Sequence, residues 1–183
     1  LDIDEIATVV DDPERVLGMH FFSPANIMRL LEIIKAEKTS PAILATVLKL
    51  AKSIKKVGAV AGVCHGFIGN RMLTGYSREA NLLVLEGAPP EQVDRVLYEF
   101  GMPMGVIAMA DMAGIDIGTR LRQQMDESDY DVMATSVADK LVAQGRCGQK
   151  TSAGFYDYQA GNRTPIPSEV TKQIINETAE EFG

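Results

Sequence analysis

Tryptophan is absent from the 183-residue chain, and cysteine and histidine are scarce, with two residues of each. Cys64 and Cys147 lie far apart, and neither belongs to a CxxC motif or to a cluster of cysteine and histidine. Closely spaced cysteines and histidines hold structural zinc, and sets of cysteines build disulfide frameworks. The sequence indicates neither, and it favours a reducing compartment, which we expect to be the cytoplasm.

Long hydrophobic runs are also missing, because charged residues or glycines interrupt every apolar stretch. We expect no membrane span and no signal peptide, since the first residues carry neither a basic nor an apolar segment. The formal net charge of −7 disfavours nonspecific binding to nucleic acid or to an anionic membrane. The chain begins with leucine inside an apolar and acidic pattern, so we expect residues before Leu1 to belong to the same domain.

Enough apolar sequence is present to fill a core, since hydrophobic residues make up 46% of the chain. Residues 16–22 and 30–34 are short apolar runs bounded by turn-forming residues, which predicts two buried strands. Ser40, followed by proline, is a helix start, and apolar residues recur with helical spacing until Gly58, where we expect the helix to stop. Residues 59–64 predict a third strand. This order is typical of the end of an α/β sheet.

From residue 65 onward, segments of helical length are separated by glycine and proline. Apolar residues with helical spacing predict one long helix that ends near Gly87 and another that begins at Pro90. Further helices are expected over residues 104–113, 116–126, 132–144 and 168–182. The second part of the chain is therefore predicted to be all-helical.

Two residues with acid–base chemistry lie in the first two predicted strands. His20 stands at a strand end, just before a turn, and strand ends of α/β sheets are common ligand sites. Glu32 lies inside an apolar strand, where a buried carboxylate needs a partner. Neighbouring strands could bring the two together, so that the carboxylate holds the imidazole. Position alone also allows a core histidine with satisfied hydrogen bonds and a glutamate that reaches water from an edge strand.

Two further motifs carry polar residues at chain turns. GFIGNR at residues 66–71 places Asn70 in the first turn of a helix, where it either caps the helix or points toward the sheet. GQKTSAGFY at residues 148–156 ends a glycine-rich, basic loop that could contact phosphate but lacks the spacing of a P-loop. A solvated loop is the plainer interpretation of this second motif.

In order and spacing, four sequence blocks resemble the 3-hydroxyacyl-CoA dehydrogenase family, in particular the dehydrogenase part of bifunctional fatty acid β-oxidation enzymes. The blocks are GMHFFSP (18–24), MRLLEII (28–34), GFIGNR (66–71) and GQKTSAGFY (148–156). The resemblance runs from Leu1 to about Tyr158. It implies that residues 1–64 are the C-terminal end of a Rossmann-type NAD-binding domain. Residues 65–183 are then the family's helical C-terminal domain and the start of a linker to a second helical repeat.

The resemblance also implies an activity and a set of site residues. The activity is NAD-dependent oxidation of an L-3-hydroxyacyl-CoA to the 3-ketoacyl-CoA. His20 would be the general base, Glu32 its orienting partner, and Asn70 a hydrogen-bonding group at the substrate carbonyl. Ser23 and Lys150 would contact NAD, although many relatives have asparagine where this chain has Ser23.

Several of the family's features do not occur in these residues. They are the GxGxxG turn, the acidic residue that binds the ribose, and a catalytic serine expected just before Leu1. Without the turn there is no helix start to receive the pyrophosphate, so we expect a fragment that binds NAD poorly and has little or no activity. We also expect exposed helix faces and self-association or homo-oligomer formation through the helical domain.

Two rival functions remain open. The helical part could be a non-catalytic assembly module, with the sheet as a scaffold. Alternatively, the chain could belong to a dehydrogenase of short hydroxy acids. Such enzymes often use a lysine as the catalytic acid or base, so the pairing of His20 with Glu32 argues against this second rival.

Overall fold

The computed structural model describes residues 1–123 and 125–183, and the chain divides into two compact units, Leu1–Leu73 and Thr74–Gly183. Helix α3 (Gly69–Leu85) runs through the boundary between them. The sequence places the change of pattern at residue 65, in the connection that precedes this helix. The same helix therefore begins in the first unit and continues in the second.

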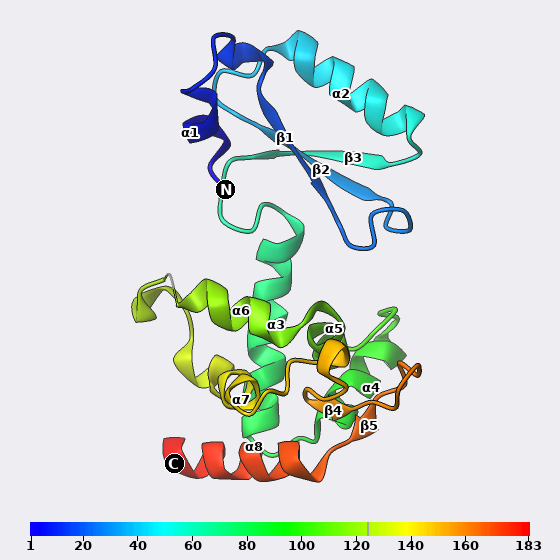
Figure 1. The fold of residues 1–183 in the computed structure, drawn as a ribbon, viewed down its shortest axis with the longest axis vertical. Coiled ribbons are helices and arrows are strands. Elements are labelled where there is room, and N and C mark those ends of the chain that lie inside the picture. The colour runs from blue at the N-terminus through cyan, green and yellow to red at the C-terminus, as the bar shows by residue number, and fades with distance from the viewer. Residues whose placement is uncertain (124) are drawn as a thin grey trace. The chain divides into compact units, whose positions relative to one another are not determined.

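The first unit is built on a three-stranded sheet, with β1 (Leu17–Phe21), β2 (Leu30–Lys35) and β3 (Val57–Gly62) in that order (Figure 1). The middle strand β2 is antiparallel to β1 and parallel to β3. All three predicted strands are thus present, with small shifts of their ends. A central strand has neighbours on both sides, and the middle of β2, from Leu31 to Ile34, is fully buried.

Helix α2 (Pro41–Ser53) begins where the sequence predicts, because the Ser40 hydroxyl accepts a hydrogen bond from the peptide N–H of Ile43. The predicted end at Gly58 is wrong. The chain leaves the helix at Lys55, which adopts a left-handed φ of 60°, and the N–H of Lys56 donates to the carbonyl of Ala51 at 2.8 Å. This helix end usually carries glycine, so a lysine in that position gave no signal in the sequence.

Two apolar clusters cover the two faces of the sheet. On one face, Leu31 and Ile33 of β2 pack against α2. On the other, Ile34 packs against Ile3 of the short helix α1 (Ile3–Ala7). Alternate residues of a strand point to opposite faces, so Glu32 lies on the same face as Ile34. A 3₁₀ turn, Pro13–Arg15, connects α1 to β1.

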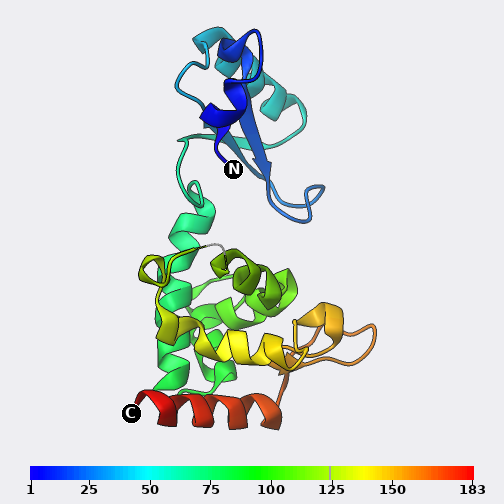
Figure 2. The same cartoon turned by 60° about the vertical axis from the view of Figure 1, so that its left-hand side comes forward.

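The second unit contains the rest of α3 and the helices that follow it in the sequence. These are α4 (Pro90–Phe100), α5 (Val106–Ala113), α6 (Ile115–Arg122), α7 (Val132–Ala143) and α8 (Glu169–Phe182). Helix α7 packs against both α6 and α8, and α8 lies beside α7 in both views (Figures 1 and 2). The predicted helices are therefore confirmed, although α6 ends earlier than the expected residue 126.

The second unit is not purely helical, which corrects the sequence prediction. β4 (Tyr156–Asp157) and β5 (Ile166–Pro167) form a short antiparallel ladder, and 3₁₀ turns occur at Glu127–Asp129 and Gln149–Thr151. Two-residue strands leave no periodic pattern that a sequence could reveal. The core of this unit is formed by buried apolar side chains of several elements, including Val84, Val93, Ile107, Leu141, Phe155 and Ile174.

Candidate active site

His20 and Glu32 face each other across the first two strands. They are direct partners in the antiparallel register of β1 and β2, so their side chains leave the sheet on the same face. The Nδ1 atom of His20 donates a hydrogen bond to Oε2 of Glu32 at 2.6 Å. The structure therefore brings together the two residues that the sequence analysis paired.

The Glu32 carboxylate is completely buried, with 0% of its side chain exposed. Its second oxygen, Oε1, accepts hydrogen bonds from the peptide N–H groups of Ile68 at 3.0 Å and Gly69 at 2.7 Å. Burial raises the pKa of this carboxyl, but the hydrogen bond from His20 and those from Gly69 and Ile68 together hold the pKa below its usual value. Glu32 is thus ionised at neutral pH, and the alternative of a solvated glutamate on an edge strand is wrong.

The peptide groups that bind Glu32 belong to the connection before α3, and its backbone is shaped to reach the carboxylate. Gly66 and Phe67 both have left-handed φ values, 71° and 48°. Gly69 is the first residue of the helix, and a Cβ at this position would lie 2.8 Å from Cζ of Phe22. No side chain larger than hydrogen fits there without movement, so the glycine allows the peptide chain to approach the site closely.

Glu32 therefore has two tasks in one position. It orients His20, and it binds two of the N–H groups that a helix leaves unpaired at its start. A negative charge at a helix start is also favourable because of the helix dipole. The carboxylate connects the sheet to α3 and at the same time completes the pair with His20.

The arrangement fixes which nitrogen of His20 can act as a base. An ionised carboxylate only accepts hydrogen bonds, so Nδ1 must carry the proton that lies between the two side chains. In a neutral imidazole the other nitrogen, Nε2, then has a free lone pair. The His20 side chain is 31% exposed, and the Phe22 and Phe67 rings lie beside it with centroids at 4.7 Å and 5.6 Å. A base at this partly exposed position can accept a proton from a molecule that binds beside His20.

Ser23 and Asn70 also lie in the first unit, and both are exposed. Ser23 lies in the connection between β1 and β2, close in sequence to the strand end that carries His20. Asn70 is the second residue of α3 and follows Gly69 directly. The contact of Ser23 with the cofactor and the contact of Asn70 with the substrate stay predictions. Ser23 follows the strand that carries His20, and Asn70 follows Gly69, whose N–H group binds Glu32.

Lys150 lies in the second unit, in the 3₁₀ turn Gln149–Thr151. Its ammonium group forms an ion pair with the buried carboxylate of Asp116, at the start of α6. The hydrogen bond from Lys150 lowers the pKa of the Asp116 carboxyl. Lys150 is thus paired with Asp116 in this structure. The cofactor contact implied by the family resemblance stays a prediction.

The motif that contains Lys150 belongs to a segment that we call the closing loop, residues 148–158. Its peptide N–H groups at Phe155 and Tyr156 and the hydroxyl of Tyr158 each donate to the Asp111 carboxylate at 2.9 Å. A Cβ at Gly154 would lie 2.1 Å from Oδ1 of Asp111, so only glycine fits. The interpretation as a solvated loop is wrong, because its three aromatic side chains are buried and the segment is bound to the buried Asp111 carboxylate.

Three groups were not predicted from the sequence: the Asp111 carboxylate, the peptide N–H groups of Ile68 and Gly69, and the Lys56 ammonium group. An aspartate within the apolar segment 106–113 was an available signal, because a buried charge requires partners. The peptide N–H groups near Gly69 and the side chain of Lys56 offered no signal in the sequence. Lys56 donates hydrogen bonds to the carbonyls of Ala25 and, at 2.6 Å, Met28, which are far from it in the sequence.

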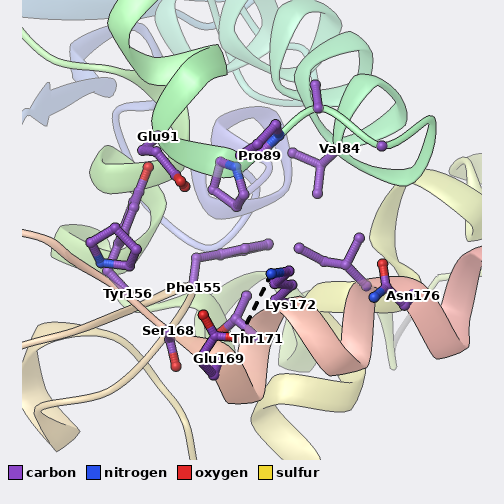
Figure 3. A pocket seen from close by; sticks show the side chains of 15 residues that line it. Val84, Pro89, Glu91, Phe155, Tyr156, Ser168, Glu169, Thr171, Lys172 and Asn176 are labelled. Carbon is purple, nitrogen blue, oxygen red and sulfur yellow. Dashed lines mark ion pairs between the residues drawn. The ribbon is translucent and has the colours of Figure 1, made fainter.

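A cavity of about 220 Å³ lies in the second unit. Phe155 lies between Pro89, at the start of α4, and Thr171 of α8 (Figure 3). Glu169 and Lys172, an ion pair at 3.8 Å, stand at its α8 side. Small-molecule sites usually enclose roughly 300 to 1,000 Å³, and the predicted site residues do not line this cavity. We assign it no part in the site.

Within residues 1–123 and 125–183, no group of three or more histidine, cysteine, aspartate and glutamate side chains could hold a metal ion. The same residues contain no helix that is both long and apolar enough to cross a membrane. Both cysteines are free thiols.

A Rossmann-type sheet with a carboxylate-held histidine base, followed in the sequence by a helical unit, is the arrangement of an NAD-dependent oxidoreductase. Two family models match the chain: the 3-hydroxyacyl-CoA dehydrogenase NAD binding domain over residues 1–64, and the C-terminal domain of the same family over residues 66–158. The chain belongs to the 3-hydroxyacyl-CoA dehydrogenase family, whose cofactor is NAD.

Curated relatives agree with this assignment. The human peroxisomal bifunctional enzyme is 45% identical over 170 residues, which is 86% of this chain and 24% of that protein. The fatty acid oxidation complex subunit alpha of Shewanella sp. (strain MR-4) is 40% identical over 176 residues, 96% of this chain and 25% of that protein. The chain thus spans about a quarter of the length of the curated relatives that it matches.

Solved structures show the same fold. The (S)-3-hydroxybutyryl-CoA dehydrogenase of Ralstonia eutropha has a TM-score of 0.77 and 32% identity, and the match covers 87% of this chain and 58% of that one. The dehydrogenase part of multifunctional enzyme 1 from C. elegans has a TM-score of 0.62 and 30% identity, covering 98% and 41%. The predicted fold class and family resemblance are confirmed.

Proposed function

We propose that the protein carrying these residues oxidises an L-3-hydroxyacyl-CoA to the 3-ketoacyl-CoA with NAD, as a step of fatty acid β-oxidation. The observation that carries the proposal is the 2.6 Å hydrogen bond from His20 to a buried, ionised Glu32 in a chain of this family. Oxidation of an alcohol needs a base for the hydroxyl proton, and the pair supplies one without a nucleophile or a metal ligand.

The residues present fit the reactive end of NAD. Ser23 is exposed beside the strand end that carries His20, and ligands of α/β sheets bind outside such strand ends. We infer that Ser23 and Lys150 hold the cofactor. NAD, when bound, accepts the hydride that leaves C3 of the substrate. The glycine-rich turn that would receive the pyrophosphate is not among these residues, so we infer that the isolated chain binds NAD weakly.

In the proposed reaction, Nε2 of His20 takes the proton of the substrate's 3-hydroxyl group. The imidazole becomes positively charged, and the Glu32 carboxylate stabilises that charge through the hydrogen bond at Nδ1. Asn70, exposed in the first turn of α3, is assigned to the substrate carbonyl as a hydrogen-bond donor. In the reverse direction, His20 returns the proton to the carbonyl oxygen at C3.

The test is turnover in the natural gene product that contains these residues. NADH formation is measured with 3-hydroxybutyryl-CoA and with free 3-hydroxy acids, before and after His20→Ala. We expect turnover of the CoA ester, and a loss of roughly 10² to 10⁴ in rate for His20→Ala. Near-normal rates in that variant would overturn the assignment, and a preference for free acids would favour the rival dehydrogenase.

We also infer that the helical unit mediates self-association into a homo-oligomer. Large apolar side chains are exposed on it, among them Phe100 at 86% and Tyr98 at 66% of α4. Exposed apolar groups of this kind favour association. Sedimentation of the chain at several concentrations tests this inference: a monomer throughout would contradict it.

For the compartment, we propose the cytoplasm, on the ground that both cysteines are free. Several relatives are named peroxisomal enzymes, in guinea pig, human and zebrafish. A peroxisomal location is therefore the alternative. Fractionation of the natural cells with a marker enzyme for each compartment decides between the two.

A further inference from the structure

The connection between β1 and β2, residues 22–29, lies beside the strand end that carries His20, and we call it the β1–β2 loop. Little apolar burial fixes this loop. Residues 23–29 are all exposed, including Ile27 at 67% and Met28 at 41%. Its own backbone is ordered by a turn, in which the N–H groups of Ile27 and Met28 donate to the carbonyl of Pro24 at 3.0 Å and 2.9 Å.

Lys56 connects this loop to the rest of the sheet. Its ammonium group donates to the carbonyl of Met28 at 2.6 Å and to that of Ala25. These two carbonyls belong to the same turn, so one cation holds both of its ends. Hydrogen bonds from a charged donor are stronger than those between neutral groups.

The backbone of Lys56 is itself held firmly. On one side, the end of α2 fixes it, because its N–H donates to the carbonyl of Ala51 at 2.8 Å. On the other side β3 begins, and the N–H of Val57 donates to the carbonyl of Arg29 at 2.8 Å. The lysine therefore extends from a rigid part of the unit to an exposed loop.

We propose that Lys56 is a positioning residue for the reaction: by holding the β1–β2 loop, it places Ser23 for binding the nicotinamide end of NAD. This inference rests on the proposed function, since Ser23 is assigned there to the cofactor. The hydrogen bonds described for the Lys56 side chain go to the β1–β2 loop and not to His20 or Glu32. Its removal should therefore weaken cofactor binding without changing the proton transfer.

The experiment compares Lys56→Met with Lys52→Met in the natural gene product. Methionine keeps most of the aliphatic stem and removes the ammonium group. Lys52 is an exposed lysine in the last turn of α2, so the control variant loses the same charge near the same helix end. Lys56→Arg keeps a cationic donor and should restore part of the lost affinity.

For Lys56→Met we expect KM for NAD to rise about tenfold, the loss of roughly one charge-assisted hydrogen bond at a half-buried site. KM for the acyl-CoA and the pH dependence of kcat should change little, because the pair of His20 and Glu32 is untouched. A variant that was merely less stable would not show this selective effect on NAD. An unchanged KM for NAD, or the same change in Lys52→Met, would overturn the proposal.

A second readout uses the 183-residue chain and needs no activity. In ¹⁵N relaxation measurements, residues 25–28 should have order parameters of a rigid backbone, about 0.85, and Lys56→Met should lower them toward about 0.6. Unchanged order parameters would show that Lys56 does not hold the loop, and would overturn the proposal while the proposed function stood. An unsubstituted gene product without turnover would instead overturn the proposed function, and the role of Lys56 in the reaction with it.

Discussion

Each unit of the molecule contains a buried carboxylate that binds three donors, and the two differ in what those donors are. Glu32 in the first unit binds two peptide N–H groups and His20. Asp111 in the second binds two peptide N–H groups and the hydroxyl of Tyr158. The pKa of Glu32 is lowered from its usual value, whereas burial raises the pKa of Asp111.

A buried carboxylate thus takes part in the proposed chemistry in the first unit and stabilises the fold in the second. The partner of Glu32 is an imidazole that can become charged and that is partly exposed to solvent. The partner of Asp111 is a phenol, and both the desolvation of Tyr158 and the adjacent charge of Asp111 raise its pKa far above neutral pH. Only the first carboxylate can support a proton transfer at neutral pH, while the second fixes the closing loop.

We expect the largest effect on turnover, and we expect it from a change at Glu32 rather than at Asp111. In Glu32→Gln, the amide oxygen must stay with the N–H groups of Ile68 and Gly69, because both are donors. The amide NH₂ then faces Nδ1 of His20, which must accept, and the proton moves to Nε2, where the base is needed. Turnover of the natural gene product should fall by roughly 10² to 10⁴, the usual range of general-base effects.

The same variant should lose little stability, since the oxygen that binds the start of α3 is retained. Steady-state kinetics and urea unfolding are both required. A variant with full turnover would show that the orientation of His20 does not depend on Glu32. A variant that unfolds would show that Glu32 acts mainly on the fold.

Asp111→Asn should show the converse behaviour. One oxygen is replaced by an NH₂ group that faces a donor, so at least one buried hydrogen bond of the closing loop is lost. We expect a loss of about 1 to 3 kcal/mol in the free energy of unfolding. Urea denaturation of the variant and of the original chain measures it, and circular dichroism reports whether the helical unit remains folded.

Stability unchanged in Asp111→Asn would contradict the structural role assigned to this carboxylate. In the natural gene product, the pH dependence of kcat should keep its shape in this variant, because Asp111 takes no part in the proton transfer. A shift in that profile would weaken the contrast between the two units.

The smallest expected effect is a difference in sign with pH. Glu32 has a lowered pKa in the folded chain, so its contribution to stability is present above its usual value of 4.5 and is lost as the pH falls through the folded pKa. Asp111 has a raised pKa, so its contribution runs the other way: stability falls as the pH rises from 3.8 toward the folded pKa.

Unfolding free energies measured from pH 3 to 7 test these signs, with Glu32→Gln and Asp111→Asn as the two references. Removing Glu32 should flatten the loss of stability in acid, and removing Asp111 should deepen it. The same sign for both variants would contradict the comparison.

Local signals in the sequence predicted most of the elements. The serine and proline before α2 and the proline that opens α4 mark helix starts, because these residues act through their own backbone and side chains. The end of α2 was missed because Lys55 takes a left-handed conformation that usually belongs to glycine. The ladder of β4 and β5 was missed because a strand of two residues is too short to show an alternating pattern of apolar and polar residues.

The site was predictable in a different way. Periodicity placed His20 and Glu32 in two strands, but strand order and register decide whether they meet, and single-strand patterns do not contain that information. The family resemblance supplied it, and the register of β1 and β2 agrees. The peptide donors of Ile68 and Gly69 could not be predicted, because every residue has a peptide N–H group and only the path of the chain selects these two.

The assignment of His20 as the base is tested directly by the protonation state of its two ring nitrogens, measured by ¹⁵N NMR of the chain at a pH where the imidazole is neutral. We expect a proton on Nδ1, toward Glu32, and a free lone pair on Nε2. A neutral imidazole with its proton on Nε2 would contradict the assignment of His20 as the base.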